Sequence, residues 1–174
     1  MRISEGKLRK IIREIIGGEV GISSGLETLQ ILLSVLRAVH FCHWTLHWQV
    51  RGESFGGDHE LMGKIYDLLS GEIDQLGEKI VSGWGREGVD MRMSITMMYG
   101  EVLGMTEELL GVEPMEMALY LEEELQQVFR QTYDDLKASG DLSLGMDDFI
   151  MSMANAHETN LYLLRARCGV DSNC

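Results

Sequence analysis

Four of the five histidines of this 174-residue chain lie between positions 40 and 59, and this clustering is its first sign of chemistry. His47 precedes a glycine-containing turn and His59 follows it, so a hairpin of two antiparallel helices would bring the two imidazoles together. On the second helix, Asp74 and Glu78 share an arc of about 100° with His59, at 3.6 residues per turn. Two imidazoles and two carboxylates form a donor set that suits Fe(II), Mn(II) or Zn(II).

The spacing of these four residues argues against a site within one chain. Asp74 lies about 22 Å beyond His59 along a helix, and Glu78 is further still. If two such helices cross antiparallel about a twofold axis, the histidine pair of one chain meets the acid pair of the other. Taken alone, the two acids would be interpreted as a solvated helix face. Their pairing with the histidines favours metal sites shared between two subunits.

Other candidate residues are interpreted as structural. His40 and His43 continue an apolar stripe, where a neutral, hydrogen-bonded histidine is more common than a metal ligand. His157 stands alone on the last predicted helix and is also expected to be structural. Three aromatic residues near the histidines are expected to serve packing: Phe41, Trp44 and Trp48.

Apolar periodicity predicts four long helices, as expected for a chain with a single proline and 45% hydrophobic residues. The first is preceded by a capping box of Ser24 and Glu27, and the third has Pro114 in its first turn. A glycine-rich crossover over 83–112 carries one short helix at 91–102 and permits parallel pairing of the second and third long helices. The predicted long helices span 26–50, 58–82, 114–138 and 143–168. The expected fold is an all-α ferritin-like four-helix bundle.

Residues 1–20 form a predicted N-terminal extension, and residues 21–174 form the ferritin-like domain. The extension carries a net charge of +2 and a basic amphipathic helix over residues 2–16. Packing of this helix on the body or on a neighbouring subunit is favoured over a DNA or membrane contact, because its isoleucines and leucines need cover. The sequence does not decide between these alternatives.

Composition restricts the function classes. The chain has a formal charge of −13, which leaves −15 outside the extension, and an acidic surface disfavours general nucleic-acid binding. Three cysteines without CxxC spacing indicate a reducing compartment. No apolar stretch is expected to reach the 18 or so residues of a membrane span. The protein is therefore expected to be cytoplasmic.

The stretch His47-Trp48-x-x-x-Gly52-x-x-Phe55-x-x-x-His59-Glu60, followed by Tyr66 and Asp74-x-x-x-Glu78-Lys79, resembles the signature of the Dps mini-ferritin family. A weaker likeness extends to His157-Glu158 and Tyr162-Leu-Leu-Arg165-Ala166. A 24-subunit ferritin is disfavoured because the chain has no Glu-x-x-His pair.

The resemblance implies a hollow dodecamer that oxidises Fe(II) at twofold interfaces, commonly with hydrogen peroxide, and stores the ferric mineral. His47 and His59 would be ligands from one subunit, and Asp74 and Glu78 from its partner. Asp148 matches an acid that lines the iron-entry pore, and Asp141 and Asp147 would add to its potential.

One position departs from the family pattern. The family usually has an aspartate four residues after the second histidine, where this chain has Gly63. The alternative hypothesis is therefore a Dps-like structural or DNA-binding shell whose weakened site holds zinc or no metal, with any DNA contact made by the N-terminal extension.

Overall fold

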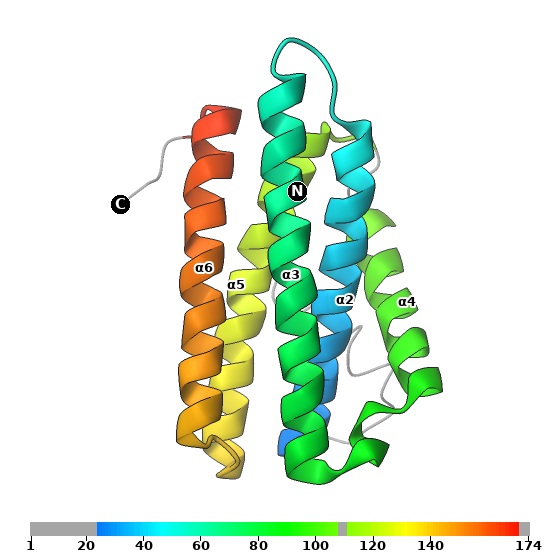
Figure 1. The fold of residues 1–174 in the computed structure, drawn as a ribbon, viewed down its shortest axis with the longest axis vertical. Coiled ribbons are helices and arrows are strands. Elements are labelled where there is room, and N and C mark those ends of the chain that lie inside the picture. The colour runs from blue at the N-terminus through cyan, green and yellow to red at the C-terminus, as the bar shows by residue number, and fades with distance from the viewer. Residues whose placement is uncertain (1–23, 108–110, 171–174) are drawn as a thin grey trace.

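A computed structural model describes residues 24–107 and 111–170 of the chain (Figure 1). This part is helical and contains no strand. The predicted helix at 2–16, the division at residue 20 and Cys174 fall outside the described residues. The elements are α2 (Gly25–Gln49), α3 (Phe55–Trp84), the 3₁₀ turn η1 (Arg86–Val89), α4 (Met91–Glu107), α5 (Pro114–Ser139) and α6 (Leu144–Cys168).

Four long helices pack side by side, and the fifth lies outside them (Figure 1). The pairs α2/α3 and α5/α6 are antiparallel hairpins, while α3 and α5 run in the same direction. The chain reaches the start of α5 through η1 and α4, and α4 packs along the outer side of α2. The all-α ferritin-like bundle with a helix in its long crossover is confirmed.

The core follows the predicted apolar stripes. Leu29, Leu32 and Leu36 of α2 are fully buried, as are Leu69 and Leu76 of α3. Burying a side chain of this size contributes roughly 1.5–3 kcal/mol relative to leaving it exposed. These stripes, rather than intrinsic helix propensity, hold the long helices against one another.

The bundle also has polar connections at its ends. Gly25 N–H, at the start of α2, donates to Asp141 Oδ2 at 3.0 Å, and a Cβ at position 25 would lie only 2.3 Å from that oxygen. Asp141, expected to serve a pore, thus bonds to the first turn of α2. At the other end, Arg167 donates from Nε and Nη2 to the two carboxylate oxygens of the buried Asp58, at 2.6 and 2.8 Å. This bidentate pair connects the end of α6 to the start of α3.

Two predicted helix boundaries were wrong. The second long helix begins at Phe55, not at residue 58, because the turn is completed at Gly52 (φ 91°) and Asp58 N–H already bonds to the carbonyl of Ser54. The crossover helix continues to Glu107 rather than ending at 102, and Met105 within this extra turn is buried against the core. Tertiary packing here outweighs the cost of the glycine at position 104.

The expectation that no stretch is apolar and long enough to span a membrane was also wrong. Within the described residues, α2 meets that criterion, with a mean hydropathy of 1.2 in its best 18-residue window. However, 61% of that window is buried inside the bundle. The central helix of a bundle is apolar on most faces for the same reason that a membrane span is.

Candidate metal centre

His47 and His59 lie against each other where α2 ends and α3 begins. Their ring centroids are 3.6 Å apart with an interplanar angle of 27°. Each Nδ1 lies near the backbone carbonyl oxygen of the other residue, at 3.0 Å for His47 and 3.1 Å for His59. The hairpin therefore brings the predicted pair into contact.

These contacts define which nitrogens are available to a metal. A carbonyl oxygen can only accept a hydrogen bond, so both Nδ1 atoms must carry the proton. In the neutral imidazoles the lone pair then resides on Nε2, and no hydrogen bond from the described residues occupies either Nε2. A hydrogen bond from one ring nitrogen to a carbonyl typically orients a histidine for metal binding through the other. The pair thus fits two nitrogen ligands of a first-row divalent ion.

Aromatic rings lie on two sides of the pair, and Gly63 lies beside it. Phe55 stacks on His59 with centroids 5.1 Å apart, and Tyr66 meets His47 edge-on at 5.2 Å. Gly63 faces His47, and a Cβ added there would lie 3.7 Å from His47 Cε1, an ordinary contact distance. The position of the missing carboxylate is therefore directly beside the ring.

Asp74 and Glu78 are exposed on α3, well down the helix from the histidine pair. At the α-helical rise of about 1.5 Å per residue, Asp74 lies about 22 Å from His59 along the helix, and Glu78 lies further still. Within the described residues of one chain, no three His, Cys, Asp or Glu side chains are arranged as a metal site. The role of all four residues as ligands of one ion therefore remains a prediction.

The three aromatic residues expected to serve packing are exposed in the single chain. Phe41, Trp44 and Trp48 retain 48%, 43% and 64% of their accessible surface, so their expected packing role would have to be met outside the bundle core. Their i, i+3, i+7 spacing places them on one face of α2, which the other bundle helices leave uncovered. Large apolar side chains gathered on one face are typical of a protein interface.

A second polar cluster lies inside the bundle, and sequence reasoning missed it. Glu122 of α5 accepts at Oε1 from His43 Nε2 (2.9 Å), and its Oε2 lies 2.5 Å from Nδ1 of His157 on α6. The other nitrogen of His157 donates to Glu72 Oε2 of α3 at 2.9 Å. His43, Glu122 and His157 are completely buried, and Glu72 is 5% exposed. His157, expected to stand alone, thus bridges two carboxylates.

The electrostatics of this cluster favour its ionised form. Burial opposes charge on both partners, yet the hydrogen bonds and charges of the two histidines lower the pKa of Glu122 to about 2. The two glutamates raise the pKa of His157 to about 9 against the same burial. A buried ion pair persists when its hydrogen bonds compensate for lost hydration, as they do here.

One sequence signal could have revealed the cluster. Glu72 falls in the apolar stripe of α3 between Leu69 and Leu76, and Glu122 lies beside Leu121 and three residues before Leu125 in α5. Burying a glutamate without a hydrogen-bond partner raises the free energy of the folded state, so each of these glutamates predicts a buried partner. The sequence does not reveal which residue of another helix that partner is.

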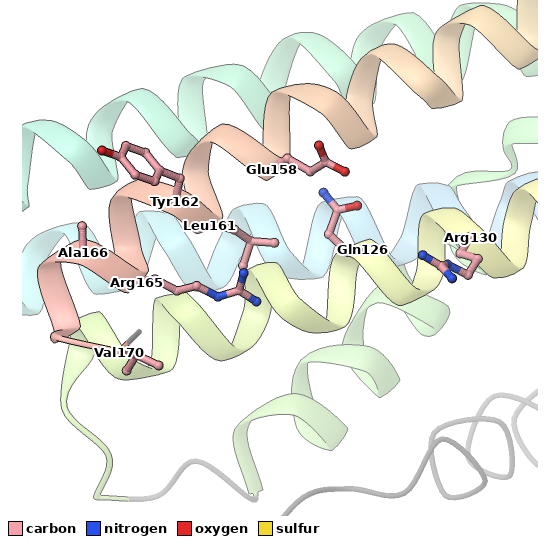
Figure 2. Close-up of a pocket in the computed structure, with 8 residues that line it drawn as sticks. All are labelled: Gln126, Arg130, Glu158, Leu161, Tyr162, Arg165, Ala166 and Val170. Carbon is pink, nitrogen blue, oxygen red and sulfur yellow. The ribbon is translucent and has the colours of Figure 1, made fainter. Parts of the chain in front are cut away.

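A surface depression lies away from both clusters. It has a volume of about 530 Å³ and opens along the outer face of α5 and α6 (Figure 2). Arg165, which lines it, is paired with Glu123 at 3.0 Å, and Gln126 donates to the carbonyl of Ala154. None of the four predicted ligands lines it, so it is not a candidate for the predicted chemistry.

The helix order and the shared direction of α3 and α5 define a ferritin-like bundle, in which α5 packs against α2 rather than pairing with α3 as expected. Comparison with solved structures specifies the type. No known sequence family and no curated protein matches the chain. A Dps mutant from Listeria innocua superimposes with a TM-score of 0.70 at 15% identity, over 87% of this chain and 97% of that chain. Dps from Mycobacterium smegmatis gives 0.65 at 20% identity, over 95% and 94%. Dps from Thermosynechococcus elongatus gives 0.67 at 14% identity, over 93% and 96%. The chain therefore has the Dps-type fold.

Proposed function

We propose that this protein is a mini-ferritin that oxidises Fe(II) at sites between subunits and stores the ferric product inside a cytoplasmic dodecameric shell. One observation carries the proposal: the stacked pair of His47 and His59, whose Nδ1 protons are held by backbone carbonyls so that both Nε2 lone pairs face away from the backbone. Asp74 and Glu78 of the partner subunit would complete each site.

The donor set explains how oxidation would be favoured. Imidazoles bind Fe(II) well, and carboxylates stabilise the higher charge of the Fe(III) product. Two Fe(II) ions would each give one electron to one molecule of hydrogen peroxide, whose O–O bond breaks to yield oxide and hydroxide in the mineral. Oxygen is the other candidate oxidant. Paired electron transfer avoids release of a hydroxyl radical, which would protect the cell.

The first test is Fe(II) loading without oxygen, followed by addition of peroxide while ferric absorbance is recorded. The expected result is rapid formation of ferric product by the parent protein and a loss of at least tenfold in the initial rate for His47→Ala with Asp74→Ala. Asp134→Asn, which removes an exposed aspartate from α5, is the matched control and should leave the rate unchanged. An unchanged rate in the double variant would show that the assigned site is wrong.

A complementation experiment tests the sharing of the site between chains. His47→Ala and Asp74→Ala are each expected to be inactive alone. When the two are co-expressed, mixed dimers contain one intact site, and random pairing restores roughly a quarter of the parental sites. If the assembled mixture stays inactive, the site does not combine the histidines of one subunit with the acids of another.

The alternative, a structural or DNA-binding shell with a weakened or zinc-holding site, is favoured only by Gly63. Its discriminating measurement is a DNA mobility shift across salt concentrations, with and without residues 1–16. A shift that disappears on deletion, together with iron oxidation no faster than in buffer, would support this alternative over the ferroxidase.

A further inference from the structure

The buried cluster lies inside the bundle, and it is separate from the histidine pair at the α2/α3 hairpin. Each of α2, α3, α5 and α6 contributes one side chain: His43, Glu72, Glu122 and His157. Figure 1 shows these four helices side by side along their lengths. All members of the cluster come from one chain, so it does not depend on a subunit interface.

Two nitrogen atoms are directed at a single carboxylate in this cluster. His43 Nε2 lies 2.9 Å from Glu122 Oε1, and His157 Nδ1 lies 2.5 Å from Glu122 Oε2. The amide of Asn160 is 3.4 Å from the same Oε2 and 3.5 Å from His157 Nδ1. Two imidazole nitrogens from different helices therefore converge on the two oxygens of Glu122.

Glu72 and His43 provide two further observations. Glu72 accepts from Nε2 of His157, the nitrogen that faces away from Glu122, and such a carboxylate–histidine contact typically orients a metal-ligating imidazole. His43 is 0% exposed, yet no described residue makes a hydrogen bond to its Nδ1. Because Nδ1 is not engaged, it is the position that can take the ring proton when Nε2 binds an ion.

We propose that this cluster is a second, intrachain site for a divalent first-row transition ion, with His43 Nε2, the Glu122 carboxylate and His157 Nδ1 as ligands and Glu72 as the positioning residue. Bundle interiors are a common location for such sites. The proposal does not rest on the intersubunit ferroxidase, because the two clusters share no residue.

The hydrogen bonds of the cluster hold its ligand atoms closer together than they would lie around an ion, so the described side chains are not arranged as a metal site. Ligand atoms bound at about 2.0–2.2 Å to one tetrahedral ion lie roughly 3.3 Å apart, whereas His157 Nδ1 and Glu122 Oε2 are 2.5 Å apart. A proton between these two atoms holds them together. Binding therefore displaces two protons: the proton between His157 and Glu122 leaves to solvent as the ion bonds to both residues, and the His43 proton moves from Nε2 to Nδ1 so that Nε2 can bind the ion.

The test uses the full chain in a His47→Ala/His59→Ala background, which removes the hairpin histidines, with Co(II) as the probe. Loading is done by incubation and also by refolding with Co(II), so that slow entry into the bundle does not hide the site. We expect about one Co(II) per chain to remain after gel filtration, with visible absorption bands of a low-coordinate nitrogen and oxygen site. Absence of bound Co(II) under both loading conditions, in a protein with parental helix content, overturns the proposal.

Two conservative variants separate a ligand from a structural residue. His43→Gln keeps a hydrogen-bond donor to Glu122 but removes the ligand nitrogen, and is expected to lose the bands. Glu72→Gln keeps the shape of the positioning residue and is expected to weaken Co(II) binding 10–100-fold with the same spectrum. Parental Co(II) affinity in folded His43→Gln would also overturn the assignment. Because the hairpin histidines are absent throughout, failure here leaves the ferroxidase proposal to its own test.

Discussion

Gly63 is the residue with the clearest consequence for iron chemistry. A side chain at this position would point to His47 without a clash, since the nearest atoms to an added Cβ are 3.7 and 3.8 Å away, both on the His47 ring. The glycine is therefore not required by packing. What it removes is a carboxylate beside the two imidazoles, and with it a charge that would stabilise Fe(III).

Gly63→Asp is expected to increase the initial rate of Fe(II) oxidation severalfold, because it adds an oxygen ligand next to His47. Ferric absorbance after peroxide addition measures the change. Gly63→Ala is the matched control: it should stabilise α3 by about 0.5–1 kcal/mol without affecting the rate. Equal rates in the two variants would show that a carboxylate here does not reach the metal.

Individual residues differed in how far the sequence could predict them. Contact between His47 and His59 was predictable, because a short turn determines which residues face each other across a hairpin. The contact of His43 and His157 with Glu122 was not, because it depends on the rotation and relative height of three helices. Periodicity locates a residue on the face of its own helix and gives no partner on another.

At the scale of elements, α2 depends on the loop between α5 and α6. Its first backbone N–H groups bond to Ser24 and Asp141, and the second contact requires the close approach of Gly25. The sequence predicted the Ser24 cap from its local motif. It did not reveal Asp141, which lies 116 positions away along the chain.

Gly25→Ala is expected to lower the free energy of unfolding by about 1–2 kcal/mol, because the new Cβ displaces Asp141 from the start of α2. Chemical denaturation monitored by circular dichroism measures this loss. Gly104→Ala, where nothing lies within 4 Å of an added Cβ, should be neutral or stabilising. A Gly25→Ala protein as stable as the parent would contradict the role given to Asp141.

The crossover helix α4 contains a buried carboxyl group, Glu101, that should make the free energy of unfolding depend on pH. Burial raises the pKa of Glu101 from 4.5 to about 7, so the folded protein holds its proton more tightly than the unfolded chain does. The contribution of Glu101 to the free energy of unfolding is therefore fully present below pH 4.5 and is lost as pH rises through 7. At about 1.4 kcal/mol per pKa unit, this loss is at most roughly 3 kcal/mol.

The corresponding measurement is the free energy of unfolding of the parent and of Glu101→Gln at pH 5 and pH 8. The parent should lose stability between these values by more than the variant, which has no carboxyl group to ionise there. Parallel profiles would indicate that Glu101 ionises without cost, for example because solvent reaches it when α4 opens locally.

At the scale of the whole molecule, the exposed aromatic face of α2 is the strongest sign of assembly. Fold comparison establishes the Dps-type fold, and the described residues of the chain leave Phe41, Trp44 and Trp48 without a covering partner. The sequence marked these residues as apolar but gave no means of distinguishing burial in the core from burial against another subunit.

If the proposed shell covers this face, Trp44→Glu combined with Trp48→Glu is expected to reduce the particle mass to small species while helix content is retained, because two charges would be buried in the contact. Light scattering after gel filtration reports the mass, and circular dichroism reports the folding of the subunit. A particle of parental mass would place the aromatic face outside the assembly contacts.

The bidentate contact of Arg167 with Asp58 has a practical consequence for engineering the chain. Cargo fused after Gly169 would leave the guanidinium in place, and the bundle should tolerate it. A fusion joined at Arg165 would delete the cation and leave the Asp58 carboxylate, only 4% exposed, without its partner at the start of the helix that carries His59. The usable attachment point for a display scaffold therefore begins just beyond α6, not within its last turn.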